Sequence, residues 1–169
     1  MRIGIIGTRG VPNFYGGFEQ FAAYLSKYLA QKGHEVFVYN SSLHPYKEKT
    51  WEGVNLVHCY DMEDKIGSAG QFVYDLNCIL DSRKRKFDII LQLGYTSSSV
   101  WAFLLPKNAT IVTNMDGLEW KRTKFSAKTQ WFLMKAEKWA VNSSKVLVAD
   151  SLGIQYYLSE KYNVASTYI

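Results

Sequence analysis

The sequence predicts an α/β domain in which a parallel sheet is covered by helices on both faces. Short runs of β-branched and aromatic residues alternate along the chain with longer stretches of helical periodicity, and parallel strands need such crossover connections. The runs are apolar almost without interruption, as expected of strands with no face in water. With 169 residues, 47% of them apolar, the chain is long enough for one domain with a substantial core.

Six apolar runs are predicted to be strands. They are rich in Ile, Val, Leu and aromatic residues and are bounded by turn residues such as Gly, Asn and Asp. These runs are residues 2–7, 35–39, 54–60, 87–93, 109–113 and 145–149. Residues 166–169 begin one more extended segment where the chain stops, which we expect of a truncated chain rather than of a natural terminus.

Five stretches between these runs are predicted to be helices. They span residues 17–32, 68–85, 97–105, 126–142 and 151–162. In the first, apolar residues recur at the spacing of one helix face, at Phe18, Ala22, Leu25 and Leu29. Ser97 and Ser151 are expected to cap the third and fifth helices.

Composition excludes several classes of protein. Two cysteines, Cys59 and Cys78, without a CxxC pair support neither a disulfide framework nor a zinc module, and no metal site is expected. The N-terminus lacks the apolar core of a signal peptide, and no run approaches the roughly 18 apolar residues of a membrane span. We therefore expect a cytoplasmic protein, at most peripheral to a membrane. The net charge of +5 permits an anionic partner without requiring one.

The first candidate site is the glycine-rich segment GTRGVPNFYGG, residues 7–17, between the first strand and the first helix. Gly16 and Gly17 lead into the helix N-terminus, whose unsatisfied N–H groups and positive dipole end suit a phosphate. Arg9 adds a cation for a phosphate or a carboxylate. The segment lies at the carboxyl ends of the strands, where open α/β sheets bind ligands. The other interpretation is a turn that only reverses the chain, with Glu19 as a helix-start carboxylate.

The spacing of these glycines excludes two common nucleotide sites. It is neither the GxGxxG of nicotinamide and flavin enzymes nor the GxxxxGK[ST] of ATP- and GTP-binding loops. The missing GxGxxG also argues against a nucleotide-sugar epimerase or dehydrogenase.

The second candidate site is NMDGLEWKR, residues 114–122, after the fifth strand. Asp116 and Glu119 are carboxylates three residues apart, a residue type used in acid–base catalysis. Trp120 offers a flat apolar face for a sugar ring or a base, and Lys121 and Arg122 add two cations. Polar, aromatic and glycine residues thus meet at the edge where a ligand is expected. The alternative is a solvated turn before a helix.

A third feature is a basic and aromatic stretch over residues 121–139. Its basic residues are Lys121, Arg122, Lys124, Lys128, Lys135 and Lys138, and Glu137 is the only acidic residue among them. Such a helix suits the surface of an anionic membrane, where each cation contributes about 1 kcal/mol. The alternative is a core helix with a solvated cationic face.

Four segments together resemble a known enzyme family. Gly16–Gly17 before the first helix, GHEVFVY at 33–39, NMDGLEWKR at 114–122 and ADS at 149–151 are similar to the N-terminal domain of family 4 glycosyltransferases of the two-domain GT-B type. The similarity is strongest to the bacterial rhamnosyltransferase-like group of polysaccharide synthesis, whose N-terminal region has been catalogued as a domain of unknown function.

The resemblance implies a Rossmann-like fold that forms one half of a GT-B architecture. Residues 1–169 correspond to the N-terminal, acceptor-side domain, and the active site of such enzymes lies in the cleft between two domains. The C-terminal, donor-binding domain with its paired glutamates has no counterpart in this chain. The chain alone is therefore expected to be inactive.

The resemblance also assigns roles to single residues. Gly16 and Gly17 match the glycine loop that approaches the donor diphosphate and sugar, and Arg9 is placed with them as donor-binding. Asp116 falls where many relatives have an active-site histidine, and we interpret it as the catalytic residue that contacts the transferred sugar. The acceptor-binding residues implied are Tyr15, Glu119, Trp120, Lys121 and Arg122.

The reaction implied is transfer of a hexose or deoxyhexose, such as rhamnose, from a nucleotide sugar to a saccharide hydroxyl. Such hexosyltransferases usually retain the anomeric configuration and need no metal or other cofactor. The saccharide acceptor is expected to be linked to polyprenyl diphosphate, which would place the enzyme at the inner face of the membrane; no nucleic-acid partner is expected. The alternative function is a stand-alone module that binds an anion or a saccharide without catalysis.

Overall fold

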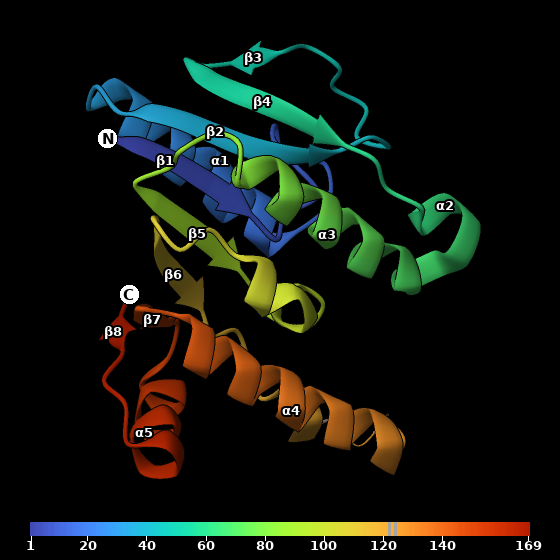
Figure 1. The fold of residues 1–169 in the computed structure, drawn as a ribbon, viewed down its shortest axis with the longest axis vertical. Helices are drawn as coiled ribbons and strands as arrows, with labels where there is room; N and C mark the ends of the chain where they lie inside the picture. The colour runs from blue at the N-terminus through green and yellow to red at the C-terminus, as the bar shows by residue number, and fades with distance from the viewer. Residues whose placement is uncertain (122, 124) are drawn as a thin grey trace.

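The computed structural model describes residues 1–121, 123 and 125–169. Within them the strands form an eight-stranded sheet in the order β3-β4-β2-β1-β5-β6-β7-β8 (Figure 1). The strands are β1 (Arg2–Ile6), β2 (Glu35–Ser41), β3 (Thr50–Trp51), β4 (Val54–Cys59), β5 (Ile89–Leu93), β6 (Thr110–Asn114), β7 (Val146–Ala149) and β8 (Thr167–Tyr168). All neighbours pair in parallel except β3 and β4. The predicted sheet is confirmed, with one antiparallel strand added at its edge.

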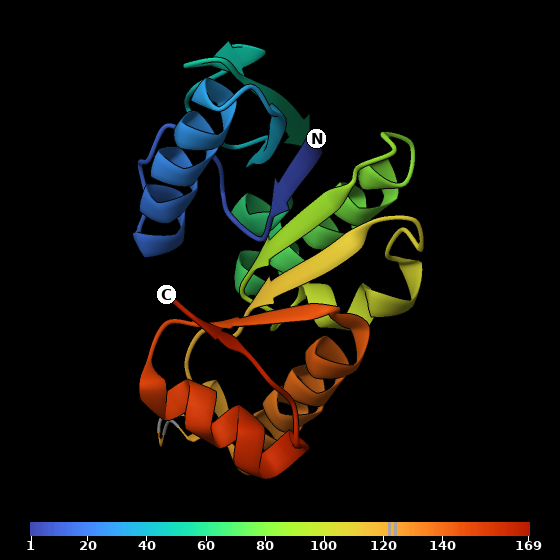
Figure 2. The same cartoon turned by 90° about the vertical axis from the view of Figure 1, so that its left-hand side faces the viewer.

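Helices cover both faces of this sheet, as predicted. They are α1 (Gly17–Gln31), α2 (Glu63–Ile66), η1 (Gly67–Ala69), α3 (Gly70–Ser82), η2 (Ser98–Leu104), η3 (Glu119–Lys121), α4 (Ala127–Ser143) and α5 (Leu152–Tyr162). α1 lies on one face, and α3, η2 and α4 lie on the other (Figures 1 and 2). α5 contacts β7 and β8 at the end of the sheet. The helix predicted over 68–85 is confirmed as α3 with shorter bounds, because residues 68 and 69 belong to η1 and the helix ends at Ser82; α2 was not predicted.

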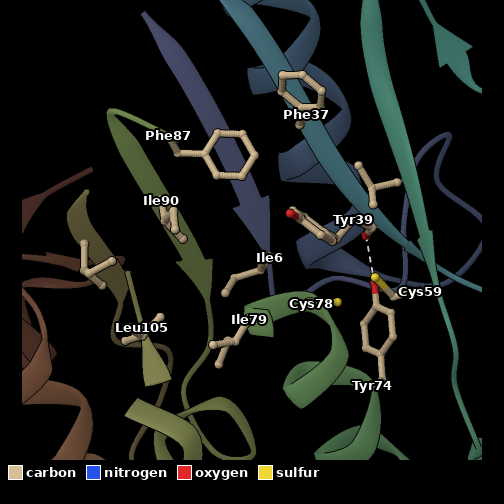
Figure 3. Packing of buried hydrophobic residues seen from close by; sticks show 12 residues of the cluster. Ile6, Phe37, Tyr39, Cys59, Tyr74, Cys78, Ile79, Phe87, Ile90 and Leu105 are labelled. Atoms are coloured by element: carbon tan, nitrogen blue, oxygen red, sulfur yellow. Dashed lines mark hydrogen bonds between the residues drawn. The ribbon is translucent and has the colours of Figure 1, made fainter. Parts of the chain in front are cut away.

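Successive residues of the central strands enter different cores. Ile5 and Val38 pack with the side chains of α1, whereas Ile6 and Tyr39 pack with α3 and η2 (Figure 3). Both faces of β1 and β2 are therefore buried, which explains why these strands read as continuous apolar runs.

The edge strand β3 was not predicted. It joins β4 through Glu52 and Gly53, which both have positive φ, at 49° and 82°, as a tight hairpin turn requires. A strand of two residues, Thr50 and Trp51, is too short to show any periodicity in the sequence.

The starts of the two C-terminal helices follow the expected chemistry. Ser151 accepts a hydrogen bond from the backbone N–H of Ile154 at 3.2 Å, so the predicted cap of α5 is confirmed. Ser126 accepts one from Thr129 N–H at the start of α4. In the described part of the chain, no helix combines the length and apolar character needed to cross a membrane.

Candidate functional site

A cavity of about 380 Å³ opens at the carboxyl edge of the sheet, within the range of roughly 300–1,000 Å³ typical of ligand sites. The segments after β1, β5 and β6 line it together with α1 and α3. Arg9, Gly17, Asp116 and Glu119 are all among its lining residues. The two segments selected from the sequence, at 7–17 and 114–122, therefore meet at one site.

Gly17 has open space where a side chain would be. A Cβ built there would meet nothing within 4 Å, so neither packing nor backbone conformation requires glycine. Gly16 precedes it as the extended N-cap of α1 and is not among the described lining residues. Gly7 differs, because its φ is +83° and a Cβ would lie 2.3 Å from the carbonyl oxygen of Leu93. Gly7 is thus required by the fold, whereas Gly17 leaves room for a ligand.

The buried carboxylate of Glu19 fixes the start of the glycine-rich segment. Its Oε1 accepts hydrogen bonds from the hydroxyl of Thr8 at 3.2 Å and from the backbone N–H of Arg9 at 2.8 Å. Glu19 is 5% exposed and lines the cavity. Its role is therefore more specific than the helix-start carboxylate that the sequence indicated.

Arg9 is already paired with a carboxylate. Its Nε and Nη2 donate to the two oxygens of Glu63 at 2.9 and 2.5 Å, a bidentate geometry that is strong and directional. The hydrogen bond to Glu63 raises the pKa of Arg9, and the same contact lowers the pKa of Glu63. The guanidinium also lies over the ring of Tyr15, 5.7 Å from its centre. An anionic ligand would have to compete with Glu63 for this cation.

The end of β2 holds the middle of the glycine-rich segment in place. The side-chain amide of Asn40 accepts from Val11 N–H at 3.1 Å and donates to Val11 C=O at 2.8 Å. His44 Nε2–H donates to Pro12 C=O at 3.1 Å, and its Nδ1 accepts from Tyr46 N–H at 3.2 Å. Burial lowers the pKa of His44, which is consistent with a neutral ring in a supporting role.

Two buried carboxylates that the sequence did not single out, Asp61 and Asp75, also line the cavity. Ser41 donates to Asp61 at 2.6 Å, and Ser97 donates to Asp75 at 2.5 Å. Burial is the main cause that raises the pKa of Asp75 to about 7, and the charge of Asp61 adds to it. Asp75 can therefore exchange a proton near neutral pH. The local sequence did not distinguish Asp75 from other polar helix residues, because its burial on α3 arises only in the folded protein.

Ser97 differs from its prediction. Its side chain makes no capping hydrogen bond to η2 and is used by Asp75 instead. The prediction from helix-start preference was therefore wrong about this residue.

The segment of Asp116 is held between β6 and η3. Met115, which is buried, donates its N–H to Val148 C=O at 2.8 Å, and the hydroxyl of Tyr95 donates to Gly117 C=O at 3.3 Å. Gly117 has a φ of +54°, which turns the chain back toward the cavity. These contacts present Asp116 and Glu119 to the same space as Asp75.

Comparison with known proteins assigns the chain to a family. A model described as Domain of unknown function (DUF1972) matches residues 1–169. The chain belongs to this family. No curated protein matched the sequence.

The fold of the DUF1972 domain is similar to that of two solved structures. A sucrose-phosphate synthase from Thermosynechococcus elongatus matches with a TM-score of 0.75 at 14% identity, over 99% of this chain and 47% of that one. A second structure with the same protein name and organism matches with a TM-score of 0.62 at 12% identity, over 100% and 87%. The chain thus spans about half the length of the first structure. The fold is the Rossmann-like fold of a GT-B glycosyltransferase domain, as predicted.

Trp120 and Lys121 of the DUF1972 domain lie in a different environment from Asp116. Neither is among the described residues that line the cavity. The indole N–H of Trp120 donates to Glu137 Oε2 at 3.1 Å, and the ammonium group of Lys121 lies 5.4 Å from the indole ring centre. Tyr15 is exposed at the edge of the glycine-rich segment, and Arg122 lies outside the described residues.

Glu137, 1% exposed, is the centre of the cluster that Trp120 joins. Its Oε1 accepts hydrogen bonds from the hydroxyls of Tyr157 and Tyr162, at 2.7 and 2.6 Å, and from Lys161 Nζ at 2.9 Å. Tyr157 and Lys161 are four residues apart, and both are outside the set of described cavity residues. Here the pair stabilises the packing of α4 against α5.

The cavity of the DUF1972 domain is acidic. Its described lining includes six carboxylates and one arginine, namely Glu19, Asp61, Glu63, Asp75, Asp116, Glu119 and Arg9. No three His, Cys, Asp or Glu side chains among the described residues are placed to hold a metal ion together. Carboxylates at these positions accept hydrogen bonds, which suits a ligand with many hydroxyl groups.

Proposed function

We propose that this domain is the acceptor-side half of a retaining, metal-independent GT-B hexosyltransferase of family 4. It would move a hexose or deoxyhexose, such as rhamnose, from a nucleotide sugar to a saccharide in cell-surface polysaccharide synthesis. The observation that carries this proposal is the single cavity lined by both Gly17 and Asp116 at the carboxyl edge of a GT-B-type sheet. The rhamnosyltransferase-like resemblance of the same two segments supports the choice of sugar.

The donor approaches from the side of α1. The free space at Gly17 admits the donor sugar and diphosphate close to the backbone, and the N-terminus of α1 after Gly16 favours the negative charge that develops on the departing diphosphate. Arg9 contributes a further cation once the donor phosphate replaces Glu63 as its partner. The second domain of the intact enzyme supplies the remaining donor contacts.

The acceptor saccharide lies over the carboxylates. Asp75 and Glu119 accept hydrogen bonds from its hydroxyl groups, and Asp116 contacts the transferred sugar. In the reaction, the bond between the anomeric carbon and the diphosphate oxygen breaks, and the acceptor hydroxyl forms the new bond and loses its proton. Asp75 is able to take a proton near pH 7 because its pKa is about 7. The resemblance adds Tyr15, Trp120, Lys121 and Arg122 to the acceptor-binding residues of this proposal.

The acceptor is proposed to be linked to a polyprenyl diphosphate, with the enzyme in the cytoplasm at the inner face of the membrane. Closure of the two domains would exclude water and so limit hydrolysis of the donor. The chain alone lacks the donor-binding half of this arrangement and should not turn over.

The test uses the full-length protein with a panel of nucleotide sugars and measures release of the nucleoside diphosphate in the presence of a saccharide acceptor. We expect turnover with at least one donor, and a loss of about 100-fold or more in Asp116→Asn, on the scale of a charged active-site contact. Asp64→Asn, an exposed carboxylate of α2 outside the lining, is the matched control. Absence of transfer with every donor would refute the proposal.

A second function is favoured by one observation. Six carboxylates line the cavity and Arg9 is already paired, which suits binding of a neutral saccharide without a phosphate. If the domain is a saccharide-binding module without catalysis, this chain by itself should bind such a sugar tightly. The full-length protein should then transfer no sugar to an acceptor.

A further inference from the structure

The outer face of α4 exposes cations and large apolar side chains together. Trp131, Met134 and Trp139 are 59%, 36% and 40% exposed. Lys128, Lys135 and Lys138 are exposed on the same helix. At 100° per residue, all six fall on the side of α4 opposite to its buried residues Leu133, Ala136 and Ala140.

No negative charge opposes these lysines on α4 itself. Glu137 is the single acidic residue of the helix, and it points inward to Trp120 and Tyr157 with 1% of its surface exposed. The fold thus removes the one carboxylate from the surface and leaves the cations there. α4 therefore has a core face and an exposed outer face that is both apolar and cationic, which agrees with both interpretations of this stretch from the sequence.

An apolar groove continues this face toward η2. It has a volume of about 460 Å³ and is lined mainly by Val100, Ala102, Phe103 and Trp139. Phe103 is 74% exposed, so a bulky apolar side chain stands at the rim of the groove. Tryptophan and phenylalanine beside lysines are the side chains that enter the boundary between lipid headgroups and acyl chains.

α4 also reaches the candidate active site. Leu133 on its inner face and Phe125 just before it line the main cavity. Figure 1 shows α4 beside η2 on the face of the sheet that also carries α3. A surface bound by the outer face of α4 would therefore be separated from the cavity by about the 10 Å diameter of this helix.

We propose that the outer face of α4, with the groove between α4 and η2, docks on an anionic phospholipid membrane. The docking deepens the proposed function, since it would hold the cavity beside a lipid-linked acceptor. Charge complementarity selects this partner, because three exposed lysines with no exposed carboxylate on the same helix favour anionic headgroups. Trp131, Trp139 and Phe103 enter the apolar boundary.

A second exposed aromatic face, on α1, fits a membrane less well. Tyr24 and Tyr28 are 72% and 56% exposed, but Lys27 is paired with Glu52 at 2.8 Å. The exposed face of α1 is therefore less cationic than the outer face of α4. Tyr24, an exposed aromatic residue on α1, is the matched control for Trp131 in the test below.

The test is flotation of this chain with vesicles of phosphatidylglycerol and phosphatidylcholine, compared with pure phosphatidylcholine. We expect binding to the anionic vesicles that is lost at about 1 M salt, where the Debye length is about 3 Å. The triple variant K128E/K135E/K138E should bind more weakly by at least about 100-fold, because each cation contributes roughly fivefold. The control K32E/K49E/K84E changes the net charge equally at exposed sites elsewhere and should bind within a few-fold of the parent.

The apolar contribution is tested separately. Trp131→Ser should weaken binding about tenfold and remove part of the tryptophan fluorescence shift on vesicle addition, whereas Tyr24→Ser should change neither. Circular dichroism verifies that each variant is folded. No binding to anionic vesicles, or an equal loss in both lysine triples, overturns the proposal. So does a dimer in sedimentation experiments that Trp131→Ser dissociates, because the face would then join two copies. Nucleotide sugars are absent throughout, so failure here leaves the proposed transfer reaction standing.

Discussion

The hydroxyl of Ser97 donates to Oδ2 of Asp75 at 2.5 Å, and this contact connects the segment after β5 to α3 within the wall of the cavity. Burial holds the pKa of Asp75 at about 7, above its usual value of 3.8. Because the folded protein keeps this proton at pH values where the unfolded chain has lost it, stability should fall as the pH rises from about 4 to 7.

Asp75→Asn should remove this dependence. The variant should match the parent near pH 4 and be more stable near pH 8 by a few kcal/mol, since it buries no charge. Urea unfolding of the parent and variant at both pH values measures the effect. Parallel stability curves across this range would contradict a buried, titrating Asp75.

Gly17→Val should separate folding from donor use. Because a Cβ at Gly17 meets nothing within 4 Å, the midpoint of unfolding should change little. The kcat/KM of the full-length enzyme for its nucleotide sugar should fall by about 100-fold or more, since small misplacements near the reacting atoms are costly. Gly7→Val is the contrast, since its Cβ would meet Leu93 and the variant should fail to fold. A normal kcat/KM in Gly17→Val would remove this residue from the site.

Glu63→Gln should make Arg9 available to an anion. Neutralising the carboxylate weakens the pair at 2.5 Å, so a nucleoside diphosphate should bind about tenfold more tightly, while Arg9→Ala should bind it more weakly. Calorimetric titration of the full-length protein measures both. Equal affinity in all three proteins would mean that Arg9 does not meet the donor phosphates.

Glu137→Gln should destabilise the domain by about 1–3 kcal/mol. The neutral amide cannot accept from Trp120, Tyr157, Tyr162 and Lys161 together, and an unsatisfied buried donor is costly. Glu160→Gln, which is exposed on α5, is the control in urea unfolding. Equal midpoints for the two variants would mean that the cluster contributes no net stability.

The fold was readable from the sequence because both faces of the central strands are buried. Ile5 and Ile6 enter different cores, so β1 is an unbroken apolar run, and the helices that follow have clear periodicity. β3 was missed because two residues show no pattern.

The candidate site was only partly predictable. Gly17 and Asp116 follow strands whose carboxyl ends must share an edge, and both line the cavity. The pairing of Arg9 with Glu63 joins residues 54 positions apart and is invisible to local patterns. Asp75 looked like an ordinary helix residue, and its importance depends on burial, which only tertiary packing creates. Trp120 has the chemistry of a sugar platform, but its indole N–H is used by a carboxylate on α4.

Asn40 has a consequence for ligand affinity although it lies beneath the binding surface. Its amide forms hydrogen bonds with both the N–H and the C=O of Val11, so the backbone close to Arg9 is ordered before any ligand arrives. Association then loses little conformational entropy in this region. Replacing Asn40 would increase the conformational entropy lost when the ligand binds. Binding would then be weaker although the ligand never touches this residue.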